Sequence, residues 1–225
     1  MEKVFRDRKH AGETLANLLK EYARENLSIL AIPNGGVPVA LPIYLKFRKN
    51  NPNIQFYLLI VRKIPIPYNT EAGFGAITLD RTIILNQPLV DRIGLTKNQI
   101  QQQVTKVMTQ MKQRLKEYGI TDQKFELRDR IAILIDDGLA SGFTMIAAIK
   151  SIQKFQPQKV IVAVPTAPQS SIDRVSPLVD KVICPNVRNT FFFAVADAYE
   201  HWYDLEIEEV RELLQKHGIS PASSQ

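Results

Sequence analysis

The chain has 225 residues, of which 45% are hydrophobic, so it can bury a core of the size that one α/β domain uses. Its net charge of +6 suits an anionic small molecule. A nucleic-acid partner remains open but is unsupported, because the basic residues are scattered and no aromatic residues alternate with them. A single cysteine excludes an internal disulfide and a multi-cysteine metal site, and the three histidines show no metal-ligand spacing.

No apolar run reaches the roughly 18 residues that a membrane-spanning helix needs. The N-terminus also lacks the apolar stretch and cleavage site of a secretory signal. We therefore expect a cytoplasmic protein without a membrane partner, folded as one domain over residues 1–225.

The first half of the chain alternates between helical periodicity and short apolar runs that are typical of buried strands. In chain order, the pattern predicts a helix at 12–24, a strand at 28–32, a helix at 37–47, a strand at 54–61, strands near 75–79 and 82–86, and a helix at 99–118. Residues 64 to about 75 are predicted to form an irregular, functional loop, because prolines and glycines interrupt them. The Gln-rich part of the 99–118 helix is interpreted as a solvated face.

The second half continues the alternation. It predicts a strand at 131–135, a helix from about 145, a strand at 159–164, a turn at Pro165-Thr166-Ala167-Pro168, a strand at 179–184 and a helix at 205–217. Strands that alternate with helices are typical of an α/β fold with a mostly parallel sheet flanked by helices.

The most informative segment is the strand 131–135 with the residues that follow it. Two carboxylates, Asp136 and Asp137, end the strand and can accept hydrogen bonds from two sugar hydroxyls at the sheet edge where α/β proteins bind ligands. The loop amides and the start of the next helix suit a phosphate, and Ser141 and Thr144 add hydroxyl donors. Together they predict a ribose phosphate site.

Other phosphate-binding motifs fit this segment less well. Gly138 and Gly142 are separated by three residues and followed by Phe143, whereas a Walker A loop needs four residues and then a lysine. A dinucleotide G-x-G-x-x-G motif is absent. An ordinary turn capped by an aspartate remains open, but it does not explain why two charges and two hydroxyls flank one loop.

The segment resembles the 5-phosphoribosyl-1-pyrophosphate (PRPP) signature of the type I phosphoribosyltransferases, with Ser141 where the family usually has threonine. The resemblance implies that Asp136 and Asp137 bind the ribose hydroxyls. It also implies a 5′-phosphate loop made of Gly138, Leu139, Ala140, Ser141, Gly142, Phe143 and Thr144. Ala140 stands where enzymes for 6-oxopurines carry an acid, which argues against hypoxanthine or guanine as the acceptor.

Two further elements suit a diphosphate. Asn34-Gly35-Gly36 is a second strand-to-helix turn with unobstructed amides, and Arg62-Lys63, near a neighbouring strand end, supplies permanent positive charge. A simple tight turn and a solvated basic pair remain the alternatives.

Motifs along most of the chain resemble a little-characterised branch of predicted phosphoribosyltransferases. They are Phe5-Arg6-Asp7-Arg8 with Ala11-Gly12, the turn Pro33 to Ala40, Val61-Arg62-Lys63, Asn69-x-Glu71 with Gly75-Ala76, and Trp202-Tyr203-Asp204. The resemblance implies a pyrophosphate loop at Asn34, Gly35 and Gly36, and pyrophosphate contacts from Arg62 and Lys63. It also implies a lid hairpin within 64–86 and a small hood from the terminal segments. The chain departs from the branch at Asn34, usually arginine, and at Ala196-Asp197, where a glycine is usual.

The implied reaction is displacement of pyrophosphate from PRPP by a ring nitrogen of a nucleobase-like acceptor, within nucleotide metabolism and nucleoside salvage. Asp136, Asp137, Arg62 and Lys63 are the expected catalytic residues, and Mg²⁺ is expected to be held mainly by PRPP oxygens, without a protein metal site. Tyr68 and Glu71 are candidate lid contacts, or ordinary loop residues. The base is expected near Pro165, Thr166 and Ala167, and the terminal aromatic cluster, Phe191 to Phe193, Tyr199, Trp202 and Tyr203, either stacks on the base or packs the last helix. A homodimer is expected.

A regulator of a different class is the alternative. It would keep the PRPP-binding fold as a sensor and bind RNA or DNA, an interpretation that Asn34 and the basic charge favour. Such a sensor needs its basic side chains on one continuous face, and an enzyme does not. A metabolite-binding protein without turnover is a third interpretation.

Overall fold

A five-stranded parallel sheet forms the centre of the molecule. The computed structural model describes residues 3–120, 124–189 and 193–219. The strand order is β2-β1-β6-β7-β9. These strands are β1 (Leu27–Ala31), β2 (Gln55–Leu58), β6 (Ile131–Ile135), β7 (Lys159–Ala163) and β9 (Lys181–Ile183). Every residue of β1 and β6 is buried, which explains why both read as apolar runs without alternation.

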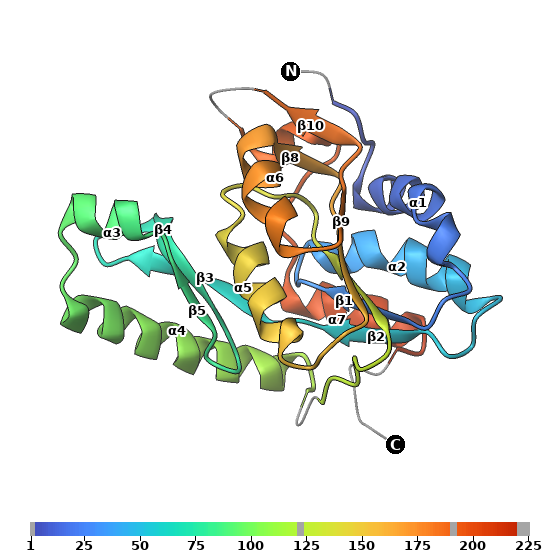
Figure 1. Cartoon of the computed structure of the whole chain (residues 1–225), viewed down its shortest axis with the longest axis horizontal. Coiled ribbons are helices and arrows are strands. Elements are labelled where there is room, and N and C mark those ends of the chain that lie inside the picture. The colour runs from blue at the N-terminus through green and yellow to red at the C-terminus, as the bar shows by residue number, and fades with distance from the viewer. Residues whose placement is uncertain (1–2, 121–123, 190–192, 220–225) are drawn as a thin grey trace.

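Helices cover both faces of this sheet (Figure 1). Because alternate residues of a strand point to opposite faces, Ile29 and Ile133 pack towards α1 (Arg8–Leu18) and α2 (Gly36–Arg48). Leu30 and Leu134 pack on the other face, with α5 (Phe143–Gln153). The predicted α/β fold with a parallel sheet flanked by helices is confirmed.

An antiparallel sheet with two helices projects from the α5 side of the molecule (Figure 1). It contains β3 (Val61–Ile66), β4 (Asn69–Thr78) and β5 (Ile83–Leu85), followed by α3 (Gln87–Ile93) and α4 (Lys97–Glu117). The prediction of an irregular loop from 64 to about 75 was therefore wrong. Pro65 is accommodated because β3 is an edge strand whose register shifts at this residue.

The N-terminal segment meets residues 198–203 at one end of the molecule, and these two segments together are called the hood below. Phe5 pairs with Tyr199 in an isolated bridge, and both lie in a small buried cluster with Ala11 and Ala198. The remaining elements are β8 (Thr166–Pro168), which pairs with β10 (Asn186–Arg188), α6 (Gln169–Val175), α7 (Ile207–Lys216) and short 3₁₀ turns at Lys20–Tyr22, Ser176–Leu178 and Val195–Ala198. Most of the predicted 165–168 turn is thus a short strand.

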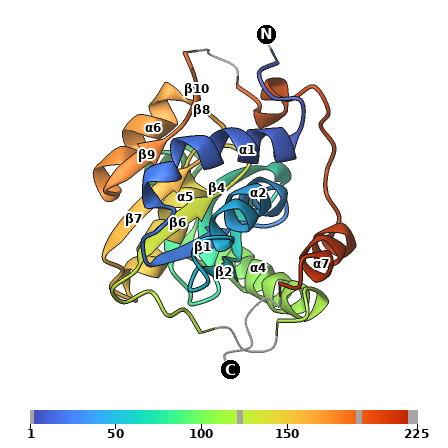
Figure 2. The ribbon, with the colours of Figure 1, turned by 90° about the vertical axis from the view of Figure 1, so that its right-hand side faces the viewer.

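The helix that closes the chain, α7, packs beside α2 and α4 (Figure 2). Within the described ranges, no helix combines the length and the apolar character needed to cross a membrane.

Candidate active site

The carboxyl ends of β1 and β6 lie side by side, because the pairing of these strands aligns Ala31 with Ile135. The residues that follow each strand therefore meet at one edge of the sheet. These are Pro33 to Gly36 after β1, and Asp136 with Asp137 after β6. Ligands of open α/β sheets bind outside this edge.

Two adjoining cavities open at this edge. The first, of about 460 Å³, is lined by Asn34, Gly35, Arg62, Lys63, Asp136 and Asp137 among others. The second, of about 350 Å³, is lined by the whole loop from Gly138 to Thr144. Lys63, Asp136 and Thr144 line both cavities. The structure thus brings the predicted ribose, phosphate and pyrophosphate residues together, although Arg62 and Lys63 lie on β3 and not directly after β2.

The loop after β1 approaches β6 so closely that only glycine fits. A Cβ atom on Gly35 would lie 1.8 Å from Oδ2 of Asp137, and one on Gly36 would lie 2.6 Å from the carbonyl oxygen of Ile135. The peptide bond between Pro33 and Asn34 is cis. The two glycines therefore place the predicted pyrophosphate loop directly against the Asp137 carboxylate and the backbone at the end of β6.

Helix α6 and β8 hold the predicted phosphate loop from outside. Ser171 donates a hydrogen bond to the Ala140 carbonyl, Arg174 donates to the Ser141 carbonyl, and the Leu139 amide donates to the Thr166 carbonyl. Gly142 has a φ of +81°, in the left-handed region that favours glycine, and it begins α5. The loop is thereby shaped before any ligand binds.

Asp137 is bound by residues that the sequence did not link to it. Arg8 Nε donates to Asp137 Oδ2 at 2.9 Å in a nearly buried ion pair, while Arg8 Nη1 donates to the Tyr203 carbonyl and its guanidinium lies 3.9 Å from the Trp202 ring centre. The Tyr199 hydroxyl donates to the Asp137 carbonyl at 2.6 Å. The hood thus holds the carboxylate in place. Only the Asp7-Arg8 motif at the N-terminus hinted at Arg8.

The two carboxylates differ electrostatically. Burial, followed by the charge of Asp137, raises the pKa of Asp136 well above its usual value. Burial also raises the pKa of Asp137, but the charge and hydrogen bond of Arg8 oppose this rise. Asp136 therefore holds its proton to a higher pH than a free aspartate.

The face of α4 that was interpreted as solvated also lines the first cavity. Lys106 and Gln110 are exposed, as expected for that face, but they line the same cavity as Arg62. At the end of α4, the Tyr118 hydroxyl donates to Asn34 Oδ1. Spacing alone does not distinguish a polar side chain that faces a cavity from one that faces bulk water.

The structure gives less support to the predicted lid and base contacts. Tyr68 lies at the turn of the β3–β4 hairpin, is 72% exposed and lines neither cavity, and the Glu71 side chain is outside the described residues. Pro165, Thr166 and Ala167 are buried and line neither cavity, and Thr166 Oγ1 donates to Asn186. Of the aromatic candidates, Phe191 and Phe192 fall outside the described residues. Tyr199 and Trp202 pack in the hood.

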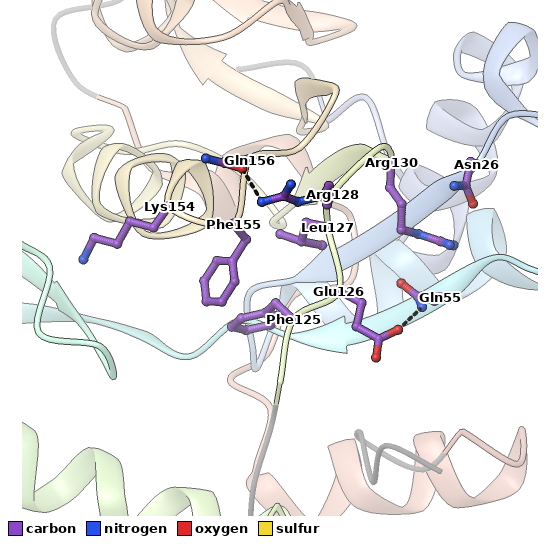
Figure 3. A pocket seen from close by; sticks show the side chains of 10 residues that line it. All are labelled: Asn26, Gln55, Phe125, Glu126, Leu127, Arg128, Arg130, Lys154, Phe155 and Gln156. Atoms are coloured by element: carbon purple, nitrogen blue, oxygen red, sulfur yellow. Dashed lines mark hydrogen bonds between the residues drawn. The ribbon is translucent and has the colours of Figure 1, made fainter.

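A third cavity, of about 500 Å³, opens at the opposite end of the parallel sheet (Figure 3). Its arginines are committed to protein atoms: Arg130 donates to the carbonyls of Leu27 and Asn53, and Arg128 donates to Gln156. This cavity therefore provides fewer available side-chain donors for an anion than the cavities at the carboxyl ends of the strands.

A model of the phosphoribosyl transferase domain matches residues 80–201. The chain belongs to this family. Two proteins of Mycobacterium tuberculosis strains, provisionally named phosphoribosyl transferases, are 30% identical over 214 residues, which are 95% of this chain and 47% of theirs. This chain thus spans about half their length. The crystal structure of the protein TT1426 from Thermus thermophilus matches with a TM-score of 0.74 and 27% identity, over 95% of this chain and 98% of that one.

The part matched by the phosphoribosyl transferase domain includes Asp136, Asp137 and the loop 138–144, but not the loop after β1 or Arg62 and Lys63. Within the described residues, no group of three or more His, Cys, Asp or Glu side chains is placed to hold a metal ion. Magnesium, which the family typically uses with PRPP, fits this site through ligand oxygens, since it often binds substrate phosphates with few protein ligands.

Proposed function

We propose that the protein transfers the phosphoribosyl group of Mg-PRPP to a ring nitrogen of a nucleobase-like acceptor and releases pyrophosphate. One observation carries the proposal. The phosphate loop lines one of two adjoining cavities, Arg62 and Asp137 line the other, and Asp136 and Lys63 line both, so one ligand with a phosphate, a ribose and a diphosphate could contact all of these groups.

In this reaction, the bond from C1 of the ribose to the diphosphate oxygen breaks and a bond from C1 to the acceptor nitrogen forms. Charge accumulates on the departing diphosphate, so fixed donors directed at it favour the transition state. Arg62, Lys63 and the Gly35 amide take this role, while Asp136 and Asp137 hold the ribose hydroxyls; the Gly36 amide donates to the Ile32 carbonyl within the loop. Magnesium held by the ligand oxygens would neutralise part of the leaving-group charge.

Exclusion of water is the second requirement, because water competes with the acceptor for C1. The β3–β4 hairpin extends from the cavity wall, and Thr70, near its turn, lines the first cavity. Closure of this hairpin over bound PRPP is the proposed means of exclusion.

The test is nucleotide formation from Mg-PRPP with a panel of purine and pyrimidine bases. We expect product and pyrophosphate with at least one base, and poor use of hypoxanthine and guanine because Ala140 provides no acid. Asp137→Asn should abolish the product. Arg128→Ala, which changes the opposite end of the sheet, should retain it.

A folded wild-type protein that binds PRPP but consumes no base would contradict the transferase. In that case, the PRPP-sensing regulator becomes the better interpretation, and RNA or DNA binding is the next measurement. The location in the cytoplasm and the homodimer stay predictions.

A further inference from the structure

Helix α4 forms one wall of the first cavity, beside β3. Lys106, Val107 and Gln110 line the cavity together with Arg62 and Lys63. Residues four apart share one helix face, so Arg114 continues the row of Lys106 and Gln110. No acidic residue occurs from Lys97 to Lys116. This helix therefore presents only cationic and neutral side chains to the cavity.

The side chain at position 34 of the loop after β1 is uncharged and is held by two hydrogen bonds. Asn34 Nδ2 donates to the Leu205 carbonyl, and Asn34 Oδ1 accepts from the Tyr118 hydroxyl. Both polar groups of the side chain are thus used to anchor the loop, to the segment before α7 and to the end of α4. The loop Asn34-Gly35-Gly36 contains no cationic side chain, so a cation for this part of the site has to come from another element.

Positive charge collects at the α4 wall. Among the residues that the structure describes, neither Arg62 nor Lys106 has a carboxylate within ion-pairing distance. The acids that line the cavity are Asp136 and Asp137, and Asp137 is paired with Arg8. Burial and the nearby charge of Arg114 lower the pKa of Arg62, although a guanidinium stays charged at neutral pH. Cations that lack counter-ions repel one another, and an anion with several charges relieves that repulsion.

We propose that Lys106, with Gln110 beside it, is a further diphosphate-binding residue that supplies the side-chain cation missing at Asn34. This inference rests on the proposed function. The ammonium group of a lysine on a flexible stem forms charge-assisted hydrogen bonds with phosphate oxygens. Because α4 and β3 face the same cavity, Lys106 and Arg62 would contact the diphosphate from two elements, while the Gly35 amide contacts it from a third.

The test compares Lys106→Ala with Lys112→Ala. Lys112 is exposed on the same helix but does not line the cavity, so its removal subtracts the same charge without the contact. Calorimetric titrations use magnesium pyrophosphate and ribose 5-phosphate as separate probes. Lys106→Ala should weaken pyrophosphate binding about tenfold, the loss expected for one charge-assisted hydrogen bond, and leave ribose 5-phosphate binding unchanged. Lys112→Ala should change neither, and Lys106→Arg should retain most of the pyrophosphate affinity.

Equal effects of Lys106→Ala and Lys112→Ala on pyrophosphate binding would overturn the inference, because long-range charge would then explain both. A loss of ribose 5-phosphate affinity in Lys106→Ala would also overturn it, since the effect would not be specific to the diphosphate. If the wild-type protein binds neither PRPP nor pyrophosphate, the proposed function fails together with the inference. If the wild type binds PRPP and the two variants behave alike, only the inference fails.

Discussion

The two ends of the candidate site are built in different ways. The proposed phosphate end comes from one continuous segment, in which β6 leads through the loop 138–144 into α5. The proposed diphosphate end combines the loop after β1, β3 and α4, and Arg8 of the hood holds the neighbouring Asp137 carboxylate. One end is thus encoded locally, and the other depends on contacts between segments that are distant in the sequence.

The largest effect that this comparison predicts follows from removing a long-range contact. Arg8→Met keeps an apolar stem against Trp202 but leaves the Asp137 carboxylate without its partner. Breaking a buried ion pair from one side costs about 3–5 kcal/mol, so we expect a large drop in the free energy of unfolding, measured with urea. The matched control is Arg6→Met, which removes an exposed pair with Asp7 and should cost about 1 kcal/mol or less. Similar losses in both variants would contradict the assigned role of Arg8.

The same contrast explains what could be predicted from sequence. The strand 131–135 was predicted with its correct bounds, because a buried β-branched run followed by two acids and a glycine is a local signal. The partner of Asp137 was not, since Arg8 is 129 positions away. Lys106 was hidden in a Gln-rich face, and β3 was mistaken for loop because its proline is tolerated only by an edge strand with a register shift. These features depend on tertiary packing, which the hydrophobic periodicity of a sequence does not reveal.

A smaller effect is expected from adding one methyl group at each end of the site. In Gly35→Ala, the new Cβ would lie 1.8 Å from Oδ2 of Asp137, a carboxylate that Arg8 holds in place. Such overpacking costs about 1–3 kcal/mol, and pyrophosphate affinity should fall as the loop moves. In Gly138→Ala, the Cβ would lie 2.6 Å from a methyl of Val195, which is half-buried on a short 3₁₀ turn and can shift.

We therefore expect Gly138→Ala to lose less stability than Gly35→Ala and to keep its affinity for pyrophosphate. Thermal unfolding and pyrophosphate titration of both variants measure the difference. A greater loss in Gly138→Ala would show that the locally encoded loop 138–144 tolerates an added methyl group less well than the loop after β1.

The smallest expected effect is that of neutralising Asp136, one of the two neighbouring carboxylates at the junction of the two ends. Burial and the charge of Asp137 raise the folded-state pKa of Asp136 above the value of 3.8 for a free aspartate. Its contribution to stability is therefore fully present below pH 3.8 and is lost as the pH rises through the raised pKa. Asp136→Asn removes this loss, so its Tm should exceed that of the wild type at about pH 8 and approach it at about pH 4.

Asp137→Asn should have the opposite sign at about pH 8, because it leaves the Arg8 guanidinium buried without its partner. Opposite signs for the two adjacent aspartates would mean that the buried charge of Asp136 destabilises the ligand-free protein, whereas the charge of Asp137 is compensated by Arg8. If both variants are more stable than the wild type at about pH 8, or if neither is, the different electrostatic roles of Asp136 and Asp137 are contradicted. At the position where the local and the composite ends meet, a stability measurement thus distinguishes a buried carboxylate without a cationic partner from one that Arg8 already pairs.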